Sequence, residues 1–317
     1  MLHLDARRIH ALSDYPGLVG ALKAMNRQGV DIIERMLLSQ PTRRQEHGTG
    51  QNDWLLLPAW SFDRYFGIKL VSVFPDNPRR DLPAIQGIYA LFDGRQGTAI
   101  ATLDGAALTL VKTAANSAMA SDLLSRKDAA LLLVCGGGAL APHLIAAHCA
   151  VRPIERVLWW SRRPEALDPA PLRALGLPVE IAGDLDRAVH AADIISTATR
   201  ATDPIIAGEW LKPGCHLDLV GGYLPEMREA DDAAFRRAAR HYVDARLTTV
   251  GVAGDVCAPL AAGLAKEGDI IDMFQLNRGE RPGREDNREI TWFKSGGGGH
   301  EDLAAAQYLY ERHIGAN

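Results

Sequence analysis

The sequence predicts an α/β protein in which a doubly wound parallel sheet is joined to a second, smaller α+β region. Three observations lead to this prediction. The chain has 317 residues, which favours two domains over one. Residues 54–111 contain strand-like stretches separated by turn sequences, and from residue 129 onward apolar strands alternate with helical segments.

The composition is that of a globular protein with a small-molecule partner. Hydrophobic residues make up 47% and charged residues 23% of the chain, and the net charge of −4 comes from interspersed signs. This pattern argues against a nucleic-acid or anionic-membrane partner. The N-terminus shows no secretory signal, and the four cysteines form no CxxC pair. We therefore expect a reduced, cytoplasmic protein.

The first part of the chain is predicted to form a helix followed by an antiparallel sheet. Residues 17–38 carry apolar side chains at helical spacing. The next stretches alternate with turn sequences such as DNP and DGRQG, which is typical of hairpins. We expect strands at 54–60, 66–74, 85–93, 98–104 and 108–111, and a helix at 113–125.

The second part is predicted to form the parallel sheet. Residues 129–151 contain no acidic or basic residue, but three glycines and a proline interrupt them, so we expect a buried strand, turn and helix there and not a membrane span. We expect strands at 130–134, 156–160, 179–182, 193–199, 216–222 and 241–245, helices at 139–150, from 185 and around 229–239, and a final strand, glycine loop and helix in 292–313.

A glycine turn after the first of these strands predicts a dinucleotide site. The sequence GGGALA fits GxGxxA, with Gly136 at the tight turn and Gly138 where a pyrophosphate approaches the backbone. Ala139 and Leu140 would then begin a helix whose free N–H groups face the phosphates. Glycine clusters are often simple turns, but the strand before and the helix after favour a nucleotide-binding turn of the Rossmann type.

The end of the next strand predicts the type of cofactor. An acidic residue there would bind the ribose hydroxyls of NAD, whereas this chain has Ser161, Arg162 and Arg163. A hydroxyl and a guanidinium suit a phosphate. We therefore expect NADP(H), with NAD(H) as the alternative, and the other reading is that both arginines only solvate a loop.

Several stretches together resemble the ornithine cyclodeaminase/mu-crystallin family. They are QPTRR, LPAW, IKLVSVFPDN, LFDGRQGT, LVKTAANSAMA, TDPIIAGEWLKPGCHLDLVGG, GDV and FKS, in the family's order along nearly the whole chain. The resemblance implies a Rossmann domain at 119–290 and a substrate-binding and dimerisation domain made from 1–118 and 291–317. It also implies a homodimer paired through the sheet of the second domain.

The resemblance assigns substrate roles to two cationic residues. Arg43 matches the family's carboxylate-binding arginine, a role that suits a guanidinium fork, although a surface arginine is the plainer reading. Lys69 matches the active-site lysine. Burial would lower its pKa and fit it for proton transfer, but from the pattern alone it could equally point to solvent.

This chain departs from the family pattern at two positions. Lys112 replaces the usual arginine, so we expect substrate binding to persist with a looser geometry. Tyr223 stands where ornithine cyclodeaminases carry an aspartate, and a tyrosine is a poor base at neutral pH. This replacement disfavours the cyclodeaminase reaction. Tyr223 is expected to be a second proton donor, or only a packing residue at a strand end.

The histidines give no sign of a metal site or of an acid catalyst. His300, which follows the glycine run, is more typical of a helix start or a surface position than of an acid catalyst. No histidine cluster at metal-ligand spacing occurs, so we expect no metal.

The resemblance also implies further cofactor contacts. Thr197 and Thr199 match a loop near the cofactor, although they could instead simply end a strand. The full set of cofactor contacts implied by resemblance is Lys112, Thr113, Thr197, Ala198, Thr199, Val220, Gly221, Gly222 and Lys294.

Together these features predict an NADPH-dependent reductase of cyclic ketimine carboxylates. The resemblance implies that Δ1-pyrroline-2-carboxylate or Δ1-piperideine-2-carboxylate would be reduced to proline or pipecolate. The alternatives are an alanine dehydrogenase-like enzyme, an ornithine cyclodeaminase that has replaced its aspartate, and a mu-crystallin-type protein that binds NADPH and a small ligand without turnover.

Overall fold

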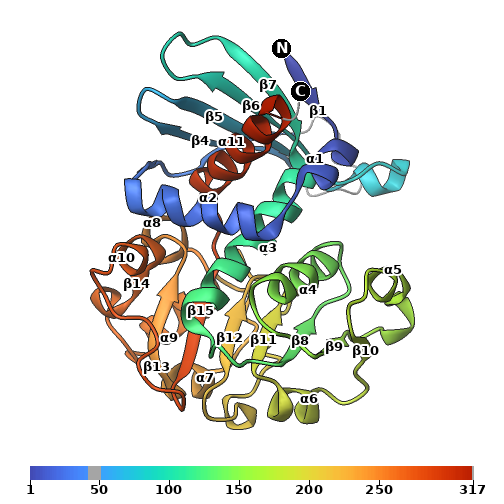
Figure 1. The fold of residues 1–317 in the computed structure, drawn as a ribbon, viewed down its shortest axis with the longest axis vertical. Coiled ribbons are helices and arrows are strands. Elements are labelled where there is room, and N and C mark those ends of the chain that lie inside the picture. Colours follow the sequence, from blue (N-terminus) through green and yellow to red (C-terminus); the bar gives the residue numbers. More distant parts are fainter. Residues whose placement is uncertain (42–50, 316–317) are drawn as a thin grey trace. The chain divides into compact units, whose positions relative to one another are not determined.

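The computed structural model describes residues 1–41 and 51–315, and in it the chain forms two compact units (Figure 1). Unit 1 comprises Met1–Asp14, Gln28–Lys112 and Gly298–Asn317, and unit 2 comprises Tyr15–Arg27 and Thr113–Gly297. Each unit contains one sheet. The two sheets differ in the direction of their strands and therefore in how they are covered.

The sheet of unit 1 has seven strands in the order β1-β7-β6-β5-β4-β2, with β3 also paired to β4. All pairs are antiparallel apart from β1 with β7. Helix α11 packs against β4, β5 and β6, and α1 packs against β7 (Figure 1). The elements are β1 Leu2–Leu4, α1 Ala6–Leu12, β2 Asp31–Ile32, β3 Met36–Pro41, β4 Gln51–Ser61, β5 Tyr65–Val73, β6 Ile85–Asp93, β7 Ala99–Asp104 and α11 Gly299–Gly315.

The sheet of unit 2 has eight parallel strands in the order β10-β9-β8-β11-β12-β15-β13-β14. The chain leaves β8 toward β9 on one side and later returns to its other side with β11, so a topological switch point lies between β8 and β11. The strands are β8 Leu131–Cys135, β9 Arg156–Trp160, β10 Val179–Ile181, β11 Ile194–Thr197, β12 His216–Leu219, β13 Ala238–Val243, β14 Ile271–Asp272 and β15 Ile290–Lys294.

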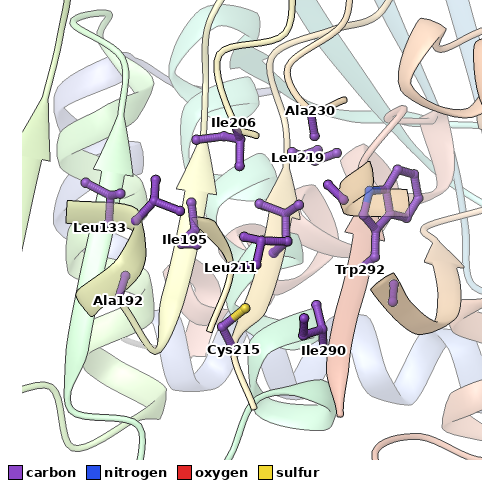
Figure 2. Close-up of a cluster of buried hydrophobic side chains, with 14 of the residues drawn as sticks. Leu133, Ala192, Ile195, Ile206, Leu211, Cys215, Leu219, Ala230, Ile290 and Trp292 are labelled. Carbon is purple, nitrogen blue, oxygen red and sulfur yellow. The ribbon is translucent and has the colours of Figure 1, made fainter. Parts of the chain in front are cut away.

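Helices cover both faces of this sheet. On one face, alternate side chains such as Leu133, Ile195 and Leu219 join Trp292 and residues of α6, α7 and α9 in one apolar core (Figure 2). The opposite face meets α3 and α4, whose Ser117 and His148 contact Asp218 of β12. The helices are α2 Tyr15–Gln28, α3 Gly105–Leu124, α4 Leu140–Val151, α5 Ala170–Ala174, α6 Leu185–Ala191, α7 Asp232–Arg237, α8 Arg246–Thr249, α9 Gly254–Ala261 and α10 Met273–Asn277, with 3-10 turns at Asn77–Arg80, Pro164–Ala166, Gly208–Trp210 and Glu267–Asp269.

Residues 129–151 form the buried strand, turn and helix that the glycines indicated, as β8 and α4. Among the described helices, none has the length and apolar character needed to cross a membrane. The predicted doubly wound parallel sheet and the antiparallel sheet are both confirmed.

Two predicted elements are wrong. The helix expected at 17–38 ends at Gln28, because Gly29 adopts a φ of +87° and the chain then enters β2 and β3. The strand expected at 108–111 is instead the first half of α3, because this buried helix is apolar on nearly all sides and hides the helical period.

The observed units also differ from the predicted domains. The boundary expected at residue 291 falls inside unit 2, because β15 pairs with β12 and β13 in the parallel sheet. Helix α2 also belongs mostly to unit 2, where the Asn26 amide contacts the Met119 sulfur on α3. The sequence does not reveal that β15 and α2 belong to unit 2, because each is far along the chain from the elements that it contacts.

Candidate active site

The glycine turn after β8 has the backbone geometry of a phosphate site. Gly136 has a φ of +140°, and a Cβ atom there would lie 2.5 Å from the Ala198 carbonyl oxygen, so only glycine fits. Two hydrogen bonds hold the turn against β9. The Gly136 N–H donates to the Trp160 carbonyl (2.9 Å), and the Trp159 indole N–H donates to the Gly136 carbonyl (2.7 Å). A Cβ on Gly138, by contrast, would meet open space, which leaves room for a ligand.

A pocket of about 410 Å³ opens at this turn, at the switch point between β8 and β11. It brings together seven residues that the sequence assigned to the cofactor. Ala139 and Leu140 lie just behind it, where α4 begins. The arrangement fits the adenosine and pyrophosphate half of a dinucleotide. The predicted residues that line the pocket are Gly136, Gly138, Ser161, Arg162, Arg163, Ala198 and Thr199.

Three exposed arginines give the pocket a positive charge. Arg162 and Arg163 follow β9, and Arg200 follows β11 on the other side of the glycine turn. Within the described part of the chain none of the three forms an ion pair, and no acidic side chain lines the pocket. The pocket is therefore suited to an anionic group at its rim. Arg200 had not been predicted, although its position directly after Thr199 was visible in the sequence.

A buried carboxylate, Glu229, holds two of the predicted cofactor loops together. Its Oε1 accepts hydrogen bonds from the backbone N–H and the hydroxyl of Thr199 (2.7 and 2.8 Å), and its Oε2 accepts from the Gly221 N–H (2.8 Å). Gly221 must be glycine, because a Cβ would collide with the Thr199 backbone. Burial raises the pKa of Glu229 to about 6; the Lys294 ammonium opposes this rise and the Asp255 carboxylate adds to it.

The cofactor contact predicted for Lys294 stays a prediction, and the structure shows where its side chain lies. Its side chain is fully buried at the end of β15, and its ammonium lies 3.4 Å from Asp255 Oδ2. Asp255 Oδ1 in turn accepts the Glu229 and Ala230 N–H groups (2.8 and 3.2 Å). Lys294 therefore stabilises the buried acids that hold the loops.

The remaining predicted positions in unit 2 lie at the same strand ends. Thr197 closes β11 with a fully buried side chain, and Val220 and Gly222 follow β12. Tyr223 comes next and is 43% exposed, so it is not a packing residue of the core. Thr113 is half-buried on α3 and does not line the pocket. The cofactor contacts of Thr113, Thr197, Val220 and Gly222 and the proton-donor role of Tyr223 remain predictions.

Unit 1 contains a second cluster, built from charged side chains. Lys69 on β5 is buried, donates to the Thr109 hydroxyl on α3, and lies 3.2 Å from Asp302 Oδ1 at the start of α11. Lys112, also buried, lies 2.6 Å from Glu301 Oε2. The expectation that Lys69 points inward is therefore met, and the solvent-facing alternative is wrong.

The surroundings of Lys69 lower its pKa. Burial is the main cause, the Lys112 charge adds to it, and the Asp302 carboxylate opposes it. Lys69 lies opposite Tyr89 of β6, whose hydroxyl occupies the space that a side chain at Gly67 would need. The pKa of Tyr89 is raised well above its usual value by burial and by the Asp302 charge, so this hydroxyl stays protonated. An ammonium with a lowered pKa gives up its proton more readily than an ordinary lysine does.

Two other predicted residues have different outcomes. Arg43 lies outside the described residues, so its carboxylate-binding role stays a prediction. His300 lies at the start of α11, as expected of a helix-start residue, but it is buried, so the surface alternative is wrong. Within residues 1–41 and 51–315 no group of His, Cys, Asp or Glu could hold a metal ion.

Sequence reasoning missed the buried acids of both clusters. Glu301 and Asp302 follow a glycine run at a helix start, where acids usually solvate the N-terminal turn. Glu229 and Asp255 lie in stretches without periodicity. The sequence signal that comes nearest to revealing them is a pair of adjacent acids, in HEDLAAA, within an otherwise apolar helix start.

The sequence profile of the ornithine cyclodeaminase/mu-crystallin family matches residues 23–317. The chain belongs to this family. Similar proteins include Δ1-pyrroline-2-carboxylate reductase of Paracoccus denitrificans, 42% identical over 255 residues that cover 79% of this chain and 80% of the relative. Protein SAR DEFICIENT 4 of Arabidopsis thaliana is 38% identical over 289 residues, 87% of this chain and 88% of the relative.

A solved structure with two bound ligands has a similar fold. Δ1-Pyrroline-2-carboxylate reductase of Thermococcus litoralis, in complex with NADH and L-proline, superposes with a TM-score of 0.88 at 26% identity, covering 100% of this chain and 98% of that protein. The family membership and two-domain α/β fold expected from the sequence are thereby confirmed.

Proposed function

We propose that this protein is an NAD(P)H-dependent reductase of cyclic ketimine carboxylates, which converts Δ1-pyrroline-2-carboxylate or Δ1-piperideine-2-carboxylate to proline or pipecolate. The observation that carries the proposal is the pair of buried ammonium groups in unit 1, Lys69 and Lys112, each held by a carboxylate. Two buried ammonium groups suit the carboxylate of an amino or imino acid. Relatives and a solved structure with this named activity support it.

The reduction divides between the cofactor and this chain. The reduced nicotinamide, when bound, supplies a hydride to the carbon of the protonated C=N bond. Lys112 would bind the substrate carboxylate. Lys69 would bind the same group or give the ring nitrogen the proton that makes its carbon electrophilic, for which its lowered pKa suits it. Tyr223 is proposed as a second proton donor.

For the cofactor, the proposal is that NADP(H) is preferred over NAD(H). Ser161, Arg162 and Arg163 line one side of the dinucleotide pocket, and Arg200 lines it from the loop after β11. A 2′-phosphate on the adenine ribose would supply the anion that these arginines lack. The neighbouring structure that holds NADH supports the dinucleotide itself.

The proposed assembly is a homodimer that pairs through the unit 1 sheet. Large apolar side chains are half-exposed there although they lie on regular strands. A second copy of the same chain would cover them. They are Met36, Leu37 and Leu38 on β3 and Ile85 and Ile88 on β6. The molar mass of the purified protein from light scattering tests this proposal, and a monomer would refute it.

The central test is a direct assay of the purified protein. Loss of the near-ultraviolet absorbance of NADPH or NADH would be followed in parallel with the five- and six-membered ring imines. We expect oxidation with at least one ring size and faster turnover with NADPH. If neither cofactor is oxidised, the reductase proposal fails. Assays with alanine and with ornithine, in which NADH formation or ammonia release is measured, would then distinguish the alternatives.

A further inference from the structure

The start of helix α11 places two consecutive acids in the interior of unit 1. The side chains of Glu301 and Asp302 are 2% and 1% exposed. Consecutive residues of a helix project about 100° apart, so the two carboxylates reach different partners. Asp302 reaches Lys69 on β5, and Glu301 reaches Lys112 on α3.

The order of exposure shows which group a ligand would meet. The Lys69 and Lys112 side chains keep 8% and 6% exposure, whereas the acids behind them have almost none. A small ligand therefore reaches the ammonium groups first. The acids act on it through the lysines, which makes them positioning residues and not binding residues.

Close packing fixes the acids in place. A Cβ on Gly299 would lie 2.9 Å from the carbonyl oxygens of Leu57 and Pro58, so the helix start lies directly on β4. Leu57 is the strand neighbour of Lys69 in the sheet register. The helix start, β4 and β5 thus form one rigid corner, and Asp302 has little freedom to leave Lys69.

We infer that the two acids have separate duties: Asp302 keeps the Lys69 ammonium charged and directed for proton donation, and Glu301 orients Lys112 for binding of the substrate carboxylate. The inference rests on the proposed reductase function. It assigns the two steps of the reaction, binding and protonation, to two adjacent residues of one helix turn.

The charges around Lys69 set the direction of the expected effect. Burial and the Lys112 charge lower the pKa of Lys69, and Asp302 together with Glu301 opposes them. Tyr89, which faces Lys69 from β6, stays neutral because burial raises its pKa. Removal of the Asp302 charge therefore lowers the pKa of Lys69 further, and the ammonium is lost at a lower pH.

The test compares Asp302→Asn with Glu301→Gln, since each removes one charge with little change in shape. For Asp302→Asn we expect kcat to fall about 10- to 100-fold, and the alkaline limb of kcat/KM to move roughly one pH unit lower. For Glu301→Gln we expect KM for the imine to rise about 10-fold, with kcat nearly unchanged. The alkaline limb should move less than in Asp302→Asn, because the Glu301 charge supports the Lys69 ammonium more weakly than the Asp302 charge does. NADPH affinity should stay the same in both.

A double-substitution cycle separates positioning from folding. In a Lys69→Met background, Asp302→Asn should cause no further loss of kcat, because the group through which it acts is already gone. Asp302→Glu should return the alkaline limb toward that of the unaltered enzyme. An Asp302→Asn loss that leaves the pH profile unmoved, or that adds to the Lys69→Met loss, would overturn the inference.

The inference and the proposed function can fail separately. If the unaltered protein reduces neither imine, the function fails, and the pKa of Lys69 is then followed directly by NMR of lysine labelled with 15N. A lower pKa in Asp302→Asn, with a smaller change in Glu301→Gln, would support the role of Asp302. An equal pKa in all three proteins would refute it.

Discussion

The two candidate sites of this protein are built by opposite means. The pocket of unit 2 is formed largely by backbone: Gly136, Gly137 and Gly138 line it without side chains, and exposed arginines stand at the rim. The cluster of unit 1 is formed by side chains, with Lys69 and Lys112 buried against two acids.

The difference explains what each site is able to do. A backbone site binds a large, common cofactor through N–H groups, and its charges lie in water where their interactions are weak. A site of buried charges costs desolvation energy but holds an ammonium in one place with an altered pKa, which chemistry requires. We therefore expect changes in unit 1 to affect the rate, and changes in unit 2 to affect cofactor affinity or stability.

The largest effect should follow Lys69→Met, which removes the proposed donor from the charged site. We expect kcat/KM for the imine to fall about 100- to 10,000-fold, because a positioned acid contributes on that order. Affinity for NADPH, measured by fluorescence titration, should persist. The control is Lys127→Met, an exposed lysine, which should leave the rate unchanged. A loss of cofactor affinity equal to the loss of rate would break the proposed division between the sites.

The glycine turn of unit 2 is tested by two neighbouring glycines that differ in backbone conformation and in the space around them. Gly136→Ala forces a Cβ into the Ala198 carbonyl at positive φ, and we expect the free energy of unfolding to fall by about 1–3 kcal/mol. Gly138→Ala meets open space, so the melting temperature should stay the same while KM for the cofactor rises. Equal destabilisation of both variants would show that Gly138 serves the fold alone.

Arg162 and Arg200, which line the dinucleotide pocket, allow a comparison between NADPH and NADH. We expect Arg162→Ala and Arg200→Ala each to raise KM for NADPH about 10-fold and to leave KM for NADH unchanged, because only NADPH carries the extra phosphate. Arg156→Ala is the matched control. It lies at the other end of β9 and pairs with Glu180, so neither KM should change. Equal losses with both cofactors would place Arg200 at the pyrophosphate.

The last comparison concerns Glu229, a buried carboxylate of unit 2 with a raised pKa. Between about pH 4.5 and 6 the folded protein binds more protons at Glu229 than the unfolded chain does. The contribution of Glu229 to the free energy of unfolding therefore falls as pH rises through this range. Relative to Glu229→Gln, the free energy of unfolding should fall by about 2 kcal/mol across this window. Denaturant titrations at several pH values measure it. A constant difference across the window would contradict the raised pKa.

Local signals in the sequence determined most of the fold. Most strands of the two sheets were predicted because their apolar residues and turn sequences lie within short windows, as in residues 85–93 of β6. The strands β1, β2, β3 and β14 were not predicted. The C-terminal end of α2 was not predicted, because Gly29 ends the helix inside an apolar run. The place of β15 in the parallel sheet was hidden too, because its partners β12 and β13 are remote in sequence.

The same distinction holds for the sites. The sequence by itself determined the glycine turn, the arginines after β9 and the two site lysines, since each stands in a short motif or matches a family position. Only the tertiary structure showed that Asp302 lies behind Lys69, that Arg200 shares the pocket of Arg162, and that Lys294 is buried. The physical reason is that an ion pair is set by distance in space, and a sequence records the identity of each charge but not its partner.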